Sequence, residues 1–136
     1  MDFFAFVSQE FILVFLLTVL VIAYFTLDSA AGGKTIDNNE AVRLVNQGDA
    51  VFIDLRKAKD YSVGHIAGAI NHEHTKLLAD PTLINNNKQS TIVLVDAMGQ
   101  HTGGVGKKLK EQGFDVVRLR GGMADWRGQN LPVAKS

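Results

Sequence analysis

Residues 54–71 read DLRKAKDYSVGHIAGAIN, and this stretch decides how the rest of the chain is interpreted. It begins at the end of an apolar, β-branched run, AVFIDL, which has the composition of a buried strand. Asp54 and Arg56 carry opposite charges at this strand end, where they can pair and hold the fold. Gly64 and Gly68 permit tight turns or a close approach of two backbone segments. The stretch therefore predicts a strand that leads into a closely packed loop.

Three short apolar runs have the composition of parallel strands that are covered on both faces. They are Ala50–Leu55, Thr91–Val95 and Val116–Leu119. Helical patterns stand between them, at Glu73–Ala79 and Gly103–Gln112. An earlier short helix is indicated by the capping pair Asp37 and Glu40, and Gly48 suits its end. Strands that alternate with helices predict a small α/β domain with a parallel sheet over residues 35–136.

An uncharged apolar run, FILVFLLTVLVIAYFTL, occupies residues 11–27. As a helix it covers about 25 Å, so flanking residues must help it to cross a hydrocarbon core of about 30 Å. The alternative is a cleaved signal peptide, for which residues 29–31 offer small side chains. The acidic N-terminus and the length of the run favour an uncleaved anchor. We therefore expect a tail at 1–10, a transmembrane helix at 11–27 that contacts the lipid bilayer, and a linker at 28–34.

The 14 basic and 14 acidic residues give no net charge, but they are unevenly distributed. Residues 1–33 carry a charge of −3, which leaves +3 for the remainder. That surplus is too small for a nucleic-acid-binding surface. No basic residue precedes the apolar run, whereas Lys34 and Arg43 follow it closely. The positive-inside rule therefore predicts an outside N-terminus and a cytoplasmic C-terminal domain, most simply at a bacterial inner membrane.

The loop after the second predicted strand is the candidate binding site. It reads Asp96-Ala97-Met98-Gly99-Gln100-His101-Thr102 and leads into Gly103-Gly104. Parallel sheets bind ligands at the carboxyl ends of their strands. A glycine-containing loop that enters a helix presents backbone N–H groups and a positive dipole end, which suit an anion. Many such loops, however, only connect a strand to a helix.

Two motifs, together with this loop, resemble the rhodanese homology domain, the sulfurtransferase fold. The first is D-x-R followed by acid-Y-x-x-G-H-I-x-G-A-x-N, which is carried by Asp54, Arg56, Asp60, Tyr61, Gly64, His65, Gly68 and Asn71. The second is G-G-x-x-x-W with G and P-V after it, which is carried by Gly121, Gly122, Trp126, Gly128, Pro132 and Val133. The resemblance covers residues 35–133 and implies a small parallel sheet flanked by helices, here preceded by the apolar helix.

Several of these residues have a structural role as their simplest explanation. Trp126 is expected in the core, and His65 is expected to be buried and hydrogen-bonded rather than to bind a ligand. His72 and His74 could form a metal pair, but no third ligand stands nearby. We therefore expect two exposed histidines, no metal site and no cofactor.

The resemblance fails at one decisive position. In active members of the family the loop opens with a cysteine that carries sulfur as a persulfide, in a pattern like C-x-x-G-x-R-S. Asp96 stands there instead, and the chain contains no cysteine. A carboxylate cannot accept and release a sulfane sulfur. Aspartyl-phosphate chemistry needs Mg²⁺ and further carboxylates, which the loop lacks. We expect Asp96 to be a built-in anion that closes the loop to thiosulfate or phosphate.

These observations favour a non-catalytic module that binds or regulates a partner at the cytoplasmic face of the membrane. Tethering raises its effective concentration towards other membrane proteins, which are the expected partners. The alternative is a sulfurtransferase or sulfur-relay component that works with a cysteine-containing partner. Residues 11–27 contain no G-x-x-x-G, which leaves the oligomeric state open. Lys107, Lys108 and Lys110 are either a solvated face or a surface for acidic headgroups or proteins.

Overall fold

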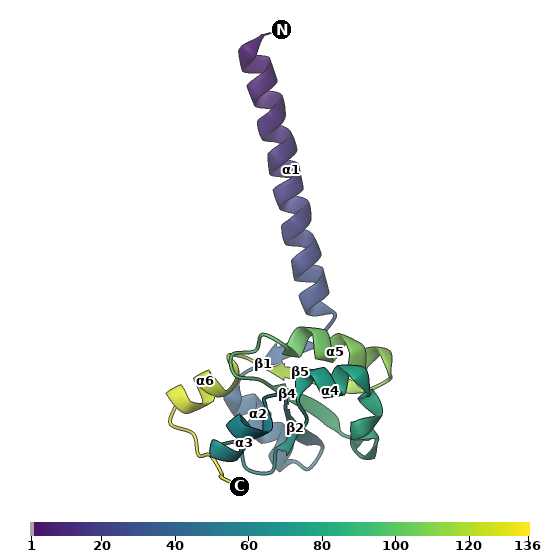
Figure 1. The fold of residues 1–136 in the computed structure, drawn as a ribbon, viewed down its shortest axis with the longest axis vertical. Helices are drawn as coiled ribbons and strands as arrows, with labels where there is room; N and C mark the ends of the chain where they lie inside the picture. The colour runs from purple at the N-terminus through teal and green to yellow at the C-terminus, as the bar shows by residue number, and fades with distance from the viewer. Residues whose placement is uncertain (1) are drawn as a thin grey trace.

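The computed structural model describes residues 2–136, with the backbone alone at 28–30. A long helix projects from a small α/β domain (Figure 1). The helices are α1 Phe3–Ala30, α2 Asn38–Asn46, α3 Ala58–Val63, α4 His74–Ala79, α5 Thr102–Glu111 and α6 Gly122–Gly128, and a 3-10 helix, η1, covers Pro81–Asn87. The strands are β1 Lys34–Ile36, β2 Ala50–Asp54, β3 Ile70–Asn71, β4 Thr91–Val95 and β5 Asp115–Leu119.

All five strands are parallel, in the order β1-β5-β4-β2-β3. The predicted small parallel sheet flanked by helices is confirmed, and the three predicted strands are its central ones. The edge strands β1 and β3 were not predicted, because runs of three and two residues are too short to give an apolar pattern. The central position of β4 places the loop that follows it in the middle of the sheet's carboxyl edge.

The core consists of one apolar layer on each face of the sheet. Alternate residues of β4 supply both layers, with Ile92 and Leu94 on one side and Val93 and Val95 on the other. The first layer includes Leu77 of α4, Ile84 of η1 and Leu109 of α5. The second includes Ala41 of α2, and Met123 and Trp126 of α6. Both faces of the sheet are therefore covered, as the continuous apolar runs predicted.

The predicted start of α2 is confirmed. Oδ1 of Asp37 accepts a hydrogen bond from the N–H of Glu40 at 2.8 Å, and Gly48 follows the helix with a φ of +83°. α4 and α5 lie within one residue of their predicted positions. The short helices α3 and α6, of six and seven residues, were not predicted, because so few residues carry little periodic signal.

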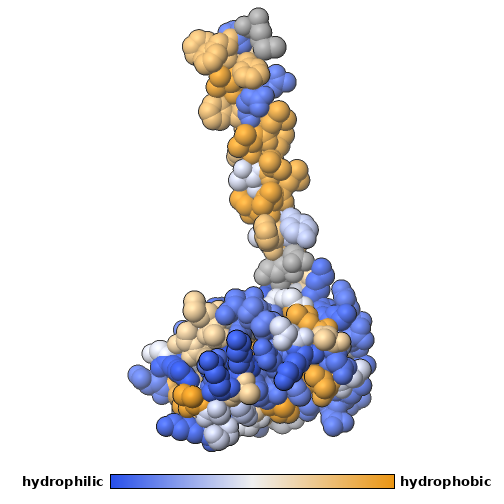
Figure 2. Space-filling model, viewed as in Figure 1, coloured by the Kyte–Doolittle hydropathy of each residue, from blue (hydrophilic) through white to orange (hydrophobic). Residues whose placement is uncertain are grey.

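Helix α1 is longer than the apolar run. Its 28 residues extend about 42 Å, and the segment Phe3–Leu27 is long and apolar enough to cross a membrane. Apolar side chains are exposed along most of its length (Figure 2). The helix begins inside the expected tail 1–10, because Oδ1 of Asp2 accepts the N–H of Phe4 at 3.1 Å. It also continues to Ala30, within the expected linker 28–34.

Candidate functional site

Asp96 stands between β4 and α5, at the carboxyl edge of the sheet. The residue is only 3% exposed. Its Oδ1 accepts a hydrogen bond from the N–H of Ala97, and its Oδ2 accepts one from the N–H of His101, both at 2.7 Å. Hydrogen bonds to an ionised acceptor are the stronger kind. One carboxylate therefore ties the first and last parts of the loop together.

Other residues of the loop form hydrogen bonds with one another. Gly99 adopts a φ of +89°, which allows the chain to turn, and its carbonyl oxygen accepts the hydroxyl of Thr102 at 3.0 Å. The N–H of Met98 donates to Oε1 of Gln100 at 3.0 Å, while the Met98 side chain is exposed at the tip. Two N–H groups of this candidate anion site thus already have an anionic acceptor, which belongs to the chain itself.

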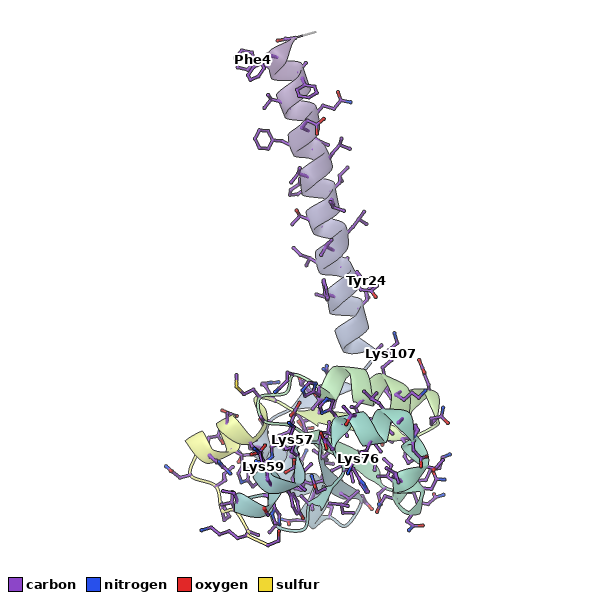
Figure 3. All side chains as sticks on the ribbon, viewed as in Figure 1. Phe4, Tyr24, Lys57, Lys59, Lys76 and Lys107 are labelled. Carbon is purple, nitrogen blue, oxygen red and sulfur yellow. The ribbon has the colours of Figure 1, made fainter. Side chains whose placement is uncertain are left out.

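A pocket of about 370 Å³ lies beside the loop. It is lined by Leu55, Arg56, Lys57, Lys59, Asp60, His74, Asp96, Ala97, Gln100 and His101. Lys57 and Lys59 lie on the face of the domain that is turned towards the viewer in Figure 3. Three Lys or Arg side chains and two carboxylates are among these residues, so the pocket suits a polar or charged ligand rather than an apolar one.

The part of this pocket that is formed by residues after β2 and β3 was not predicted from the sequence. Lys57 and Lys59 come after β2, which pairs with β4 along its whole length. His74 is brought in by the hydrogen bond from its N–H to the carbonyl oxygen of Leu55, at 3.0 Å. The rule that ligands bind at strand carboxyl ends, applied to β2 as well as β4, would have found the two lysines.

The histidines that follow β3 differ from the expectation of two exposed side chains. The rings of His74 and His101 are stacked, with centroids 3.7 Å apart and planes at 5°. His72 is half-buried, and this burial lowers its pKa below the ordinary value. The expectation was wrong because the sequence does not reveal that α4 packs beside the start of α5. The stacked pair forms part of the pocket wall.

Asp54 and Arg56 form a buried ion pair, as the sequence predicted. Nη2 of Arg56 lies 2.8 Å from Oδ2 of Asp54, and its Nε lies 3.0 Å from Oδ1. The same Nη2 donates to the carbonyl oxygen of Gly64 at 2.7 Å. The side-chain amide of Asn71 donates to the carbonyl oxygen of Arg56 at 2.8 Å. This network joins the end of β2 to the loop after α3 and to the end of β3, so it holds one wall of the pocket.

Tyr61 and His65 stabilise the turn between α3 and β3. Nδ1 of His65 lies 2.8 Å from the carbonyl oxygen of Tyr61, and the two rings are stacked at 3.8 Å. The Tyr61 hydroxyl donates to the carbonyl oxygen of Ala69 at 2.6 Å, across the turn that Gly68 makes with a φ of +82°. His65 also pairs through its backbone with Ala134. The prediction of a buried, hydrogen-bonded histidine is confirmed.

The G-G-x-x-x-W motif packs α6 against the candidate loop. Gly122 has a φ of +60°, and a Cβ at this position would collide with the carbonyl oxygen of Asp96. The N–H of Met123 donates to that oxygen at 2.8 Å. Trp126 is buried against Phe52, and its Nε1 donates to the carbonyl oxygen of Pro132 at 3.0 Å. The motif therefore has a structural role, with Trp126 in the core as predicted.

Within residues 2–136, apart from the side chains at 28–30, no three His, Asp or Glu residues are grouped as metal ligands would be. The groups available are two lysines, one paired arginine, two stacked histidines and the carboxylates of Asp60 and Asp96.

The comparisons with known proteins agree with this geometry. A family model described as "Rhodanese-like domain" matches residues 37–129. The protein YibN of Escherichia coli K12 is 36% identical over 122 residues, which cover 88% of this chain and 84% of YibN. The protein BU052 of Buchnera aphidicola is 29% identical over 117 residues, which cover 85% of this chain and 81% of BU052. The match to YibN is longer than residues 34–136, so it includes part of α1.

Solved structures show the same fold. The rhodanese-related protein of Thermoplasma volcanium superposes with a TM-score of 0.68 at 19% identity, over 76% of this chain and 99% of that one. The BH2092 protein of Bacillus halodurans superposes with a TM-score of 0.64 at 25% identity, over 83% of this chain and 84% of that one. These likenesses show that the chain shares its fold with rhodanese-related structures.

Proposed function

The chain belongs to the rhodanese-like domain family, and we propose that it is a membrane-tethered member that binds or regulates a partner protein without transferring sulfur. One observation carries this proposal. Asp96 stands where the family resemblance places the sulfur-carrying cysteine, and its carboxylate is bonded to the N–H groups of Ala97 and His101. The sequence contains no other residue that could carry a persulfide. The parallel sheet and its two packed layers are present around this position, which suits a binding role.

Helix α1 supports the tether, since its segment Phe3–Leu27 has the length and composition of a membrane span. The basic residues Lys34 and Arg43 follow that segment and none precedes it, so we place the domain in the cytoplasm and the N-terminus outside. A bacterial inner membrane fits the bacterial relatives. A domain confined to the membrane surface meets other membrane proteins at a raised effective concentration. We therefore propose integral membrane proteins as its partners.

The purified full-length protein should show no transfer of sulfur from thiosulfate to cyanide above the uncatalysed rate. The reason is the missing thiolate, for which the Asp96 carboxylate cannot substitute. Thiocyanate formation measures the activity, and an active rhodanese assayed in the same detergent is the positive control. Turnover by the protein alone would overturn the proposal. Turnover that needs an added cysteine-containing partner would favour the sulfur-relay alternative instead.

Photo-crosslinking in inverted inner-membrane vesicles should capture an integral membrane protein. Met98 is a suitable position for the crosslinker, because its side chain is 71% exposed at the loop tip beside the pocket. Lys135 is exposed and adjoins the C-terminus, which Figure 1 shows far from α1, so it is a matched control position that should give less of the same adduct. Adducts with soluble proteins only would contradict the proposed partner. Protease added outside these vesicles should digest the domain, and a resistant domain would contradict the proposed orientation.

A further inference from the structure

The junction between α1 and the domain is tightly packed. A Cβ on Gly32 would collide with the backbone of Gly103, and a Cβ on Gly106 would collide with the carbonyl oxygen of Gly32. Gly33 adopts a φ of +101°, and its carbonyl oxygen accepts the Nε–H of Arg118 at 2.8 Å. These contacts fix the start of the domain against α5 and β5. Helix α5 therefore lies directly below the end of α1 (Figure 1).

The distance from the apolar segment to α5 is short. The candidate span ends at Leu27, and Gly32 follows five residues later, with the chain helical as far as Ala30. At a rise of 1.5 Å per helical residue, Gly32 lies about 7–10 Å from the end of the span. The headgroup layer on each side of a bilayer is about 5–8 Å thick. In a membrane, α5 must therefore lie where the headgroups meet water.

Helix α5 carries basic residues on the side that contacts Gly32. Lys107 and Lys110 lie four and seven residues after Gly103, so the three share one helical face. Both lysines are exposed, and Figure 3 shows Lys107 at the base of α1. Their ammonium groups are within about one Debye length, 8–10 Å, of the expected headgroup layer. At this distance they are attracted to an anionic surface and not to a neutral one.

We propose that Lys107 and Lys110 form a site for anionic phospholipid headgroups. The ligand is the phosphodiester of an acidic lipid such as phosphatidylglycerol, which the two ammonium groups bind electrostatically. The inference rests on the membrane tether of the proposed function and is independent of sulfur transfer. Together with the contacts of Gly32, this headgroup site sets the orientation of the domain and its pocket relative to the bilayer.

The test uses the full-length protein reconstituted in phosphatidylcholine vesicles that contain trace spin-labelled lipid. Electron spin resonance gives the affinity of the protein for labelled phosphatidylglycerol relative to labelled phosphatidylcholine. Each lysine close to an anionic surface contributes about a fivefold preference, so the native chain should select phosphatidylglycerol severalfold and lose that selectivity in high salt. The double variant Lys107→Gln/Lys110→Gln should show a ratio close to one.

The matched control is Lys76→Gln/Lys135→Gln, which removes the same charge from two exposed positions outside the pocket. Figure 3 shows Lys76 away from α1, and Lys135 adjoins the C-terminus, which Figure 1 shows far from α1. The control should retain the native selectivity. No selectivity in the native chain, full selectivity in Lys107→Gln/Lys110→Gln, or an equal loss in the control would each overturn the headgroup site. A chain that alkaline carbonate extracts from the vesicles would overturn the tether itself, and this result is distinct from the other three.

Discussion

Replacing Arg56 with methionine should lower the free energy of unfolding by about 3–5 kcal/mol, because the Asp54 carboxylate is then buried without its partner. Asp54 is 1% exposed, and three N–H···O contacts of 2.8–3.2 Å join the two side chains. The carbonyl oxygen of Gly64 also loses a donor. Urea denaturation of the full chain in detergent measures the change through the fluorescence of Trp126, the single and buried tryptophan.

Two controls separate the buried charge from other effects of this substitution. Asp54→Asn/Arg56→Met removes both charges and should recover part of the lost stability. Arg127 also donates to Gly64, at 3.3 Å, but it is exposed, so Arg127→Met should change the free energy of unfolding by about 0.5 kcal/mol or less. A loss below about 1 kcal/mol in Arg56→Met would contradict the prediction, because Asp54 would then be stabilised by another group.

The centre of the fold could be predicted from the sequence, and its edges could not. β2, β4 and β5 consist mainly of apolar residues that pack on both faces of the sheet, and such runs are recognisable without knowledge of their neighbours. β1 and β3 become strands only because β5 and β2 offer them hydrogen-bonding partners. Helix α6 begins with a glycine in the left-handed region, which is a poor helix signal. Tertiary contacts, rather than local preference, determine these short elements.

Only one half of the candidate site could be predicted from the sequence. Asp96 and its loop follow the central strand directly, so the strand-end rule locates them. The lysines and His74 that complete the pocket are separated from Asp96 by more than 20 residues. They lie close to Asp96 only because β2 pairs with β4, and no local sequence pattern reveals this order of strands. The stack of His74 on His101 has the same origin.

The junction after α1 shows what composition leaves undetermined. Small residues at 28–34 predict a short linker, but they do not show whether it packs against the domain. The lack of a Cβ allows Gly32 to lie directly on Gly103 and Gly106 of α5, where no larger residue fits. A glycine therefore indicates either freedom or a close contact, and only the partner surface distinguishes the two. Here the contact determines how the domain is held below the helix.

Asp96→Ala should lower the free energy of unfolding by about 3 kcal/mol and should also allow the loop to bind a small anion. A hydrogen bond to a charged group contributes about 1.5–3 kcal/mol, and alanine leaves the N–H groups of Ala97 and His101 without their acceptor. These groups lie at the start of α5, where an anion is favoured. Thiosulfate at tenfold its dissociation constant should therefore restore about 1.4 kcal/mol to the variant and nothing to the native protein.

Asp96→Asn is the matched control, because it keeps an oxygen acceptor and nearly the same volume but loses the charge. It should lose less stability than Asp96→Ala, and its side chain should still exclude thiosulfate from the loop. Urea denaturation in sodium chloride of equal ionic strength separates binding from screening. Unchanged stability in Asp96→Ala, together with no effect of thiosulfate, would show that Asp96 is not the anion that fills this loop. Thiosulfate that stabilises the native protein equally would show that the loop is open despite Asp96.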